Sequence, residues 1–241
     1  MKKHLGSLAA GVATLALAAA PVHATTLLFD FGNLGQTTPD VGWNNVTYPS
    51  PNPPPIVSPV VDSTGAVVPG VTLEVTDQFF INGQPSQLGS ESPSGDAGVY
   101  PVSATDDYFF GHTGPFAGGP DASTAAFKLT GLDQSLAYDF TFFSARNGVG
   151  DLRETAYTVI GANSAGGLLE AANNDSEVLV LAGIVPDGNN EILVEVEAGP
   201  NNSNGLEFYY VNLMQVTTIP EPHTVGMLLV GSTVLAARRR S

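Results

Sequence analysis

The most regular feature of this chain is an alternation of apolar and polar residues in short segments. Within residues 136–145, Tyr138, Phe140 and Phe142 fall on one side of an extended chain and Asp139 on the other. A period of two residues is the pattern of a β-strand with one buried face. We therefore predict a central strand over this segment.

Similar segments recur between residues 26 and 216. Further strands are predicted over residues 26–31, 71–76, 104–110, 123–129, 155–160, 167–171, 177–184, 190–197 and 206–216. Gly, Asn, Asp and Pro residues separate them, and none of them has the pattern of an amphipathic helix. Many short strands at this spacing are typical of a sandwich. We predict an all-β domain, an antiparallel β-sandwich that is jelly-roll-like, with helices only at the two ends of the chain.

Two segments of the body lack this periodicity. Residues 48–59 are rich in proline, which has no N–H to give to a central ladder, so they predict a stiff surface loop. Residues 78–99 are rich in Gly, Ser and Pro and predict a long loop.

The first 24 residues have the order of a secretory signal peptide. Lys2 and Lys3 precede an apolar run over residues 5–20, and small residues follow up to Ala24. This order predicts export, with cleavage by signal peptidase after Ala24. An uncleaved membrane anchor is the alternative, but the apolar run is short for a span.

The last 23 residues combine three parts in a fixed order. The stiff tripeptide Pro220-Glu221-Pro222 comes first, and a mostly apolar run over residues 225–237 follows. A helix over that run reaches about 20 Å, which is short of a hydrocarbon core of about 30 Å. The chain ends on a basic cluster, which favours the cytoplasmic side of a membrane. The basic residues are Arg238, Arg239 and Arg240. The alternative is a buried core helix with a basic end, but such a helix needs no Pro-Glu-Pro.

These three parts resemble the PEP-CTERM sorting signal of Gram-negative bacteria, which is also called the ice-binding-protein C-terminal domain. The resemblance implies transient insertion into the inner membrane and processing near Pro-Glu-Pro by an exosortase-type transpeptidase. It also implies export and display at the cell surface or in the extracellular matrix. We expect a signal peptide over residues 1–24, a β-sandwich over 25–218 and the sorting signal over 219–241.

The body carries a second, looser resemblance. Its motifs are Leu28-Phe29-Asp30-Phe31-Gly32, Trp43-Asn44-Asn45, Leu129-Thr130-Gly131-Leu132 before residues 138–143, and an Asn-rich segment over 201–205. Together they resemble the galactose-binding-like, jelly-roll modules of PEP-CTERM proteins. That resemblance implies a β-sandwich of the carbohydrate-binding kind.

The charge of the body limits the classes of molecule that can bind to it. Five of the eight basic residues and one of the 23 acidic residues lie in the two ends, so the body keeps three basic residues against 22 acidic ones, a formal charge of −19. Such a domain repels nucleic acid, and we expect no nucleic-acid partner. The chain has no cysteine, so its core must hold the fold without disulfides.

The sequence offers few groups for catalysis. His112 is the only histidine of the body, and its Gly-rich loop predicts an exposed side chain. No nucleophile elbow or zinc-protease motif is present. Two acidic pairs, Asp106-Asp107 and Asp151 with Glu154, leave a carbohydrate-active hydrolase or lyase as an alternative. We predict that the protein is not an enzyme.

Loop residues favour polysaccharide binding instead, because aromatic rings, amides, carboxylates and arginines are the groups that bind sugars. They occur as Trp43-Asn44-Asn45, as Arg146-Asn147 with Asp151 and Arg153, as Asn173-Asn174-Asp175, and as Asn201-Asn202 with Asn204. The candidate ligand-binding residues are Trp43, Asn44, Asn45, Arg146, Asp151, Arg153, Asn173 and Asn174.

Each candidate has a structural alternative. Trp43 suits a core, the asparagines suit turns, and the arginines suit ion pairs with Asp151 or Glu154. The many oxygen ligands leave Ca²⁺ open as a cofactor, although no calcium-loop motif identifies a site. A purely structural matrix protein remains the third alternative for function.

Overall fold

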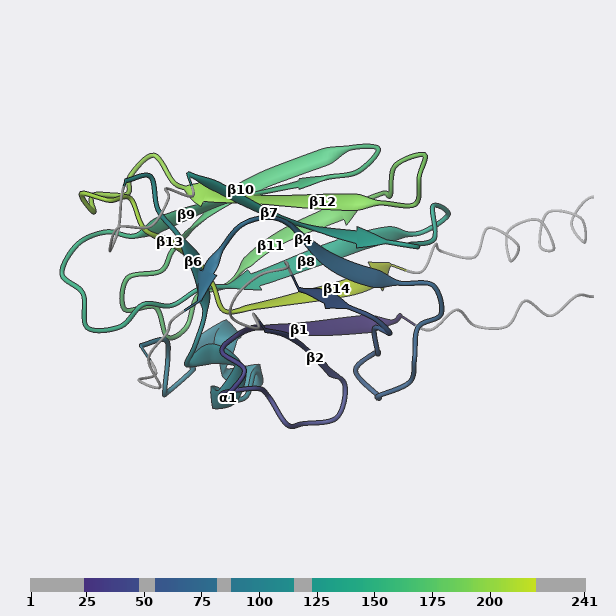
Figure 1. The fold of residues 1–241 in the computed structure, drawn as a ribbon, viewed down its shortest axis with the longest axis horizontal. Coiled ribbons are helices and arrows are strands. Elements are labelled where there is room, and N and C mark those ends of the chain that lie inside the picture. Colours follow the sequence, from purple (N-terminus) through teal and green to yellow (C-terminus); the bar gives the residue numbers. More distant parts are fainter. Residues whose placement is uncertain (1–23, 48–54, 82–87, 115–122, 220–241) are drawn as a thin grey trace, which may run out of the picture. The chain divides into compact units, whose positions relative to one another are not determined.

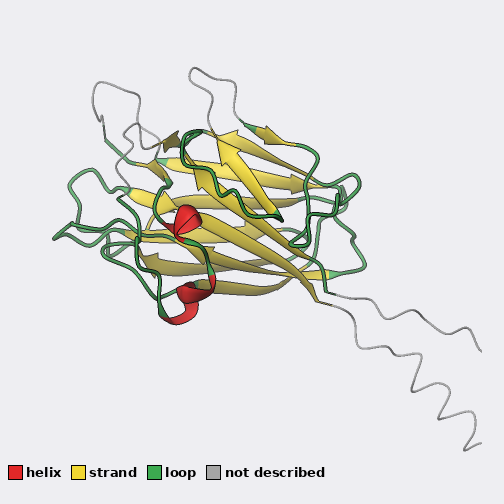
Figure 2. Cartoon of the chain, turned by 90° about the horizontal axis from the view of Figure 1, so that it is seen from below, coloured by secondary structure: helices red, strands yellow, loops and turns green. Residues whose placement is uncertain are grey.

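Two β-sheets pack face to face (Figures 1 and 2). Most of the large apolar side chains are buried between them. The computed structural model describes residues 24–47, 55–81, 88–114 and 123–219, and every statement below concerns this part of the chain. It forms a β-sandwich, as the spacing of short alternating segments predicted.

One sheet has five strands. Its order is β11 (Leu179–Ile184), β8 (Ala137–Phe143), β14 (Leu213–Ile219), β1 (Thr26–Gly32) and β2 (Trp43–Thr47). Neighbouring strands are antiparallel except β1 and β2, which run parallel. The predicted central strand over 136–145 is β8, which lies between β11 and β14.

The opposite sheet has six strands. Its order is β10 (Ser164–Glu170), β9 (Glu154–Ile160), β12 (Ile192–Ala198), β7 (Thr124–Thr130), β4 (Thr72–Asp77) and β3 (Ile56–Val57). A small third sheet contains β13 (Tyr209–Val211), β6 (Phe109–Gly111) and β5 (Phe80–Ile81). The chain crosses between the two large sheets from β7 to β8, back to β9, from β10 to β11, and back to β12.

Alternation along the strands places the core as the sequence predicted. In β12, Ile192, Val194 and Val196 are buried between the sheets, whereas Glu195 and Glu197 are exposed on the outer face. Aromatic side chains fill much of the interior. Phe142 stacks on Tyr157 across the sandwich, with 4.4 Å between ring centroids. Burial of such rings supplies the apolar area that a cysteine-free domain needs.

Several predictions about local structure were wrong. The predicted loops over residues 48–59 and 78–99 contain the short strands β3 and β5, and the second also contains a helix. Residues 104–110 do not form one strand, because the one-turn helix α1 (Val102–Thr105) precedes β6. The body therefore contains helix, including the 3-10 helix η1 (Gly95–Val99). Residues 206–216 form two strands, because a bend at Asn212 moves the chain from the small sheet into the five-stranded sheet.

Both helices pack on the outer face of the five-stranded sheet. Ala97 of η1, Ala104 of α1 and Tyr100 between them form a cluster with Phe143 and Leu213. Figure 1 shows α1 on the side of β1 and β14 that faces away from the six-stranded sheet.

The register of the ladders determines which loops share an end of the sandwich. Phe143 at the end of β8 pairs with Leu213 at the start of β14. Glu170 at the end of β10 pairs with Glu154 at the start of β9. We call this end the loop end. Its loops span residues 144–153, 171–178 and 199–208. At the opposite end, the N–H of Thr25 donates to the hydroxyl of Thr218 at 2.7 Å.

The predicted export and sorting segments lie almost wholly outside the described residues. Only Ala24 and Ile219 of those segments are described. Pro220, Glu221, Pro222, Arg238, Arg239 and Arg240 lie beyond the described part of the chain. Among the described residues, no helix is long and apolar enough to cross a membrane.

Candidate functional site: a polar pocket at the loop end

Three segments meet at the loop end and are joined by backbone hydrogen bonds. The N–H of Arg146 donates to the carbonyl of Ala171 at 2.7 Å, and the N–H of Asn173 donates to the carbonyl of Arg146 at 3.0 Å. The N–H of Asn147 donates to the carbonyl of Leu88 at 2.6 Å. These bonds hold the segment before η1 against the loops that follow β8 and β10, so the three segments form one frame.

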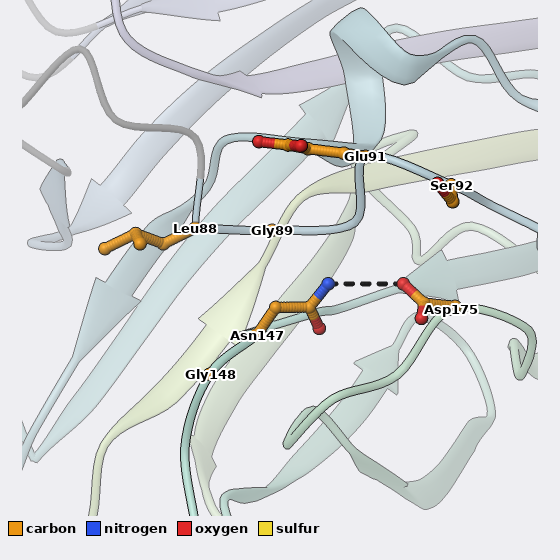
Figure 3. A pocket seen from close by; sticks show the side chains of 7 residues that line it. All are labelled: Leu88, Gly89, Glu91, Ser92, Asn147, Gly148 and Asp175. Atoms are coloured by element: carbon orange, nitrogen blue, oxygen red, sulfur yellow. Dashed lines mark hydrogen bonds between the residues drawn. The ribbon is translucent and has the colours of Figure 1, made fainter.

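A pocket of about 430 Å³ opens between these segments, and we call it the loop-end pocket. Its lining residues are Leu88, Gly89, Glu91, Ser92, Asn147, Gly148 and Asp175. Figure 3 shows residues 88–92 along one side and Asn147, Gly148 and Asp175 along the other. The volume lies in the range of roughly 300–1,000 Å³ that is usual for small-ligand sites.

The polar groups of the pocket are mainly acceptors. The carboxylate of Asp175 accepts hydrogen bonds from the hydroxyl of Ser90 and from Nδ2 of Asn147, the latter at 3.2 Å (Figure 3). Glu91 is exposed at the opposite side. The Oδ1 atom of Asn147 is buried and has no hydrogen-bond partner within the part of the chain that the structure describes. The pocket therefore offers two carboxylates to whatever enters it.

Two of the predicted ligand-binding residues, Asp151 and Arg153, pair with each other. Nε of Arg153 lies 3.0 Å from Oδ1 of Asp151, so the predicted ion pair is present. The Arg153 guanidinium also donates to the Tyr210 hydroxyl and lies 5.4 Å from the centroid of the Phe208 ring. A hydrogen bond from Asn204 and the pairing with Arg153 hold the pKa of Asp151 below its usual value. These contacts of Asp151 and Arg153 stabilise the loop before β9.

Arg146 does not line the loop-end pocket. Its Nη1 donates to the backbone carbonyl of Asn147, the next residue, and its side chain is half-buried. Asn147, and not Arg146, lines the pocket. The ion pair predicted for Arg146 with Asp151 or Glu154 is not among the interactions of the described residues.

Asn173 and Asn174 organise the loop after β10. Asn173 has a left-handed φ of 54° and its amide bonds the backbone of Gly148 and Val149. The buried amide of Asn174 donates to the carbonyl of Ser144 at 2.9 Å and also bonds backbone groups two and three residues further on. Their turn role, which the sequence left open, is present, and it places the next residue, Asp175, at the pocket.

The Trp43-Asn44-Asn45 set lies on another part of the molecule. Asn44 is buried and bonds the backbone of Leu28 and Val61, whereas Asn45 bonds the backbone of Thr38. Both amides therefore hold β2 and its neighbouring loops in place. Trp43 is half-buried on the outer face of the five-stranded sheet. Its ring meets the Tyr100 ring edge-on at 6.4 Å. The structure brings neither Trp43 nor the two asparagines to the loop-end pocket.

The prediction that His112 is exposed was wrong. Its side chain is fully buried and stacks on Phe80, with 5.0 Å between ring centroids, and it meets Phe208 edge-on. The sequence around His112 does not indicate this burial, because the aromatic neighbours of His112 come from β5 and from the segment before β13.

Asp106 and Asp107 are also buried, and they lie near a third buried acid, Asp30. Burial raises the pKa of Asp30 to about 7 and that of Asp107 to about 8, and the charge of Asp30 adds to the rise for Asp107. Neither Asp106 nor Asp107 lines the loop-end pocket. Among the described residues, no group of three or more His, Cys, Asp or Glu side chains is placed to hold a metal ion.

Sequence reasoning missed half of the pocket. Glu91 and Ser92 lie in the segment over 78–99, which shows no period and was predicted only as a loop. Asn147 and Asp175 belonged to the predicted sugar-binding sets, but they were not among the residues chosen as ligand-binding candidates. Only the three-dimensional meeting of the three segments identifies all four.

No protein-family model matches the chain, and no curated protein matches it. Solved structures of similar architecture include TmCBM61 in complex with β-1,4-galactotriose, at 11% identity and a TM-score of 0.24, covering 47% of this chain and 66% of that one. They also include an F5/8 type C domain from Bacteroides fragilis, at 12% identity and a TM-score of 0.31, covering 61% and 91%. A third is the CBM22-1 xylan-binding domain of Xyn10C from Paenibacillus barcinonensis, at 10% and 0.30, covering 64% and 85%.

The chain thus spans just under two thirds of the first of these structures. Carbohydrate-binding modules are among its structural neighbours, but identities and TM-scores this low transfer no ligand and no activity to this chain. The arguments below therefore rest on its own residues.

Proposed function

We propose that this domain is a non-catalytic module that binds polysaccharide through the loop-end pocket. The observation that carries the proposal is the convergence of Glu91, Ser92, Asn147 and Asp175 around one pocket of about 430 Å³. Carboxylates and amides are effective partners for sugar hydroxyls, and charge-assisted hydrogen bonds are the stronger ones. Loops held by two sheets present these groups on a rigid support.

A binding screen with two matched variants tests this proposal. Full-length protein is titrated calorimetrically with neutral, amino and acidic polysaccharides, with and without calcium. Glu91→Gln combined with Asp175→Asn keeps the shape of both side chains and removes both charges. Glu195→Gln combined with Glu197→Gln makes the same charge change on the exposed face of β12. We expect at least about tenfold weaker binding, or about 1.4 kcal/mol, in the pocket variant alone. Absence of binding to every polysaccharide would overturn the proposal.

A hydrolase or lyase is the second candidate, because two carboxylates line one pocket. We favour binding because Glu91 is exposed, whereas the general acid of a glycosidase is typically held in a pocket sheltered from water. Release of reducing sugar by the wild-type protein, abolished by Glu91→Gln alone, would establish an enzyme. A structural matrix protein would instead bind no saccharide and still co-purify with the extracellular polymer.

We further propose that the protein is exported and sorted to the surface or matrix of a Gram-negative bacterium. Support comes only from the two ends of the sequence, which predict passage through the export machinery, signal peptidase and an exosortase-type transpeptidase. The mature protein should begin at Thr25 and lose its C-terminus near Pro220. Intact mass of the protein recovered from its native source measures both ends, and a full-length C-terminus would contradict the sorting step. Replacing Glu221, or deleting Arg238 to Arg240, should leave uncut protein in the membrane.

A further inference from the structure

The hydrogen-bond donors of the loop-end pocket are largely consumed inside the fold. The N–H of Gly89 donates to the carbonyl of Asp106 at 2.9 Å, and that of Asn147 donates to Leu88. The N–H of Gly148 donates to Oδ1 of Asn173 at 2.9 Å. Nδ2 of Asn147 donates to Asp175. A ligand entering the pocket therefore meets few free donors, of which the hydroxyl of Ser92 is one.

Most of the acceptors of the pocket remain open to a ligand. Oδ1 of Asp175 already accepts from Ser90 and Asn147, which leaves Oδ2 of Asp175 and the carboxylate of Glu91. Among the described residues, Glu91 and Asp175 are the two charged side chains of the lining, and no Lys, Arg or His belongs to it.

Of the three described Lys and Arg side chains, two form ion pairs elsewhere, Lys128 with Glu191 at 3.1 Å and Arg153 with Asp151. The third, Arg146, donates to the backbone carbonyl of Asn147 and is not among the residues that line the pocket. A partner must therefore bring donors, and a positively charged donor fits best because opposite charges attract across a binding site.

We propose that the loop-end pocket recognises amino sugars with a free amine, in a polysaccharide that is cationic near neutral pH. This inference rests on the proposed function and specifies its ligand class. The protonated amine donates three hydrogen bonds and accepts none, which complements a pocket of two carboxylates. The body charge of −19 attracts such a polymer and repels uronic or sulfated polysaccharides.

The experiment compares three hexasaccharides. Two of them differ only in the acetylation of the amine, and the third carries a carboxylate instead of an amine. Hexamers of glucosamine, N-acetylglucosamine and galacturonic acid are titrated into full-length protein at moderate salt, in EDTA. We expect the glucosamine hexamer to bind at least about tenfold tighter than the acetylated hexamer, or about 1.4 kcal/mol. The galacturonate hexamer should not bind.

Two variants distinguish the pocket from the general charge of the domain. In Glu91→Gln with Asp175→Asn, the preference for the free amine should collapse to less than about threefold, which is about 0.6 kcal/mol. In Glu195→Gln with Glu197→Gln, which changes the net charge equally, the preference should persist. Glu91→Gln alone keeps the test valid if Asp175→Asn disturbs the loop, because Glu91 is exposed and its replacement leaves the fold intact.

Three outcomes would overturn the inference. The first is equal affinity for the glucosamine and N-acetylglucosamine hexamers, with both affinities lost in the pocket variant. This result would support the proposed function but with a different ligand class. A preference that survives in the pocket variant would assign the attraction to overall charge. Binding of a neutral hexamer that appears only when Ca²⁺ replaces EDTA, and is lost in the pocket variant, would assign the carboxylates to a metal ion. Absence of binding by all three hexamers would also overturn the inference, whereas the proposed function fails only if the wider polysaccharide screen finds no binding either.

Discussion

The side-chain amide of Asn147 donates a hydrogen bond to the carboxylate of Asp175 over 3.2 Å, which joins the loop after β8 to the loop after β10. Oδ1 of the same amide is buried without a hydrogen-bond partner. An unpaired buried acceptor costs about 1–3 kcal/mol, and each such group in a folded protein calls for an explanation. A bound ligand would supply one by donating to this atom once the side chain moves to expose it.

Asn147→Leu tests the role of this amide. The variant loses one hydrogen bond, worth about 1 kcal/mol, but it also removes the unpaired oxygen. We therefore expect the free energy of unfolding to change by less than about 1 kcal/mol, while glycan affinity falls at least about tenfold. Denaturant unfolding and calorimetry measure the two quantities. A large loss of stability, with affinity unchanged in the folded fraction, would contradict a role in binding.

The buried acids Asp30 and Asp107 predict how stability depends on pH. Their folded pKa values of about 7 and about 8 exceed the ordinary value of 3.8. Between the ordinary and the folded pKa values, the folded state therefore binds more protons than the unfolded state. Their stabilising contribution is therefore present below about pH 4 and is lost as pH rises through 7 to 8. We expect the melting temperature in EDTA to be at least about 5 °C lower at pH 8 than at pH 5.

The matched variant for that prediction is Asp30→Asn with Asp107→Asn. The amides cannot ionise, so the decline in melting temperature between pH 5 and pH 8 should become much shallower. At pH 8 the variant should be more stable than the wild-type protein. An undiminished decline in the variant would assign the pH dependence to other groups.

Gly32 at the end of β1 should tolerate no side chain. A Cβ atom there would lie 1.9 Å from Oδ2 of Asp107, whose carboxylate accepts from the N–H of Asn33. We expect Gly32→Ala to lower the free energy of unfolding by at least about 2 kcal/mol, because the core must shift to admit it. The control is Gly188→Ala, where nothing lies within 4 Å of the added atom and we expect a change within about 0.5 kcal/mol. Equal effects in the two variants would contradict this packing.

Trp43 is the only tryptophan of the chain, so its fluorescence reports on the outer face of the five-stranded sheet. Glycan binding at the loop-end pocket should leave the emission maximum and intensity of Trp43 unchanged at saturation. A sugar that stacks on this face would alter both, because the ring is half-buried. Saturable quenching by the glycan would move the site from the loop end to the sheet.

Much of the sandwich was predictable because each alternating strand carries its own signal. The period of two in β8 and β12 indicated both the strands and their buried faces. Two errors arose where tertiary contacts decide local structure. Residues 102–105 form a helix because Ala104 packs on the outer sheet face, and residues 206–216 divide because Asn212 bonds Ala145 and Thr105 at the bend.

The candidate site was predictable only in part, because its chemistry is distributed over three distant segments. The sequence identified the loops after β8 and β10 through their asparagines and arginines. It could not tell that Asn174 turns its amide inward while Asp175 faces the pocket. Glu91 had no distinguishing context among 23 acidic residues. Hydrophobic periodicity does not predict such a site, because loop conformation decides which residues line it.

The most direct test of polysaccharide binding at the loop-end pocket is a nuclear magnetic resonance titration of isotope-labelled full-length protein with the glucosamine hexamer. Gly89 and Gly148 line the pocket from opposite sides. We predict that their amide resonances move progressively and saturate, while the Trp43 indole resonance stays fixed. Saturable shifts confined to Trp43 and its neighbours on the five-stranded sheet, with Gly89 and Gly148 unmoved, would contradict the account.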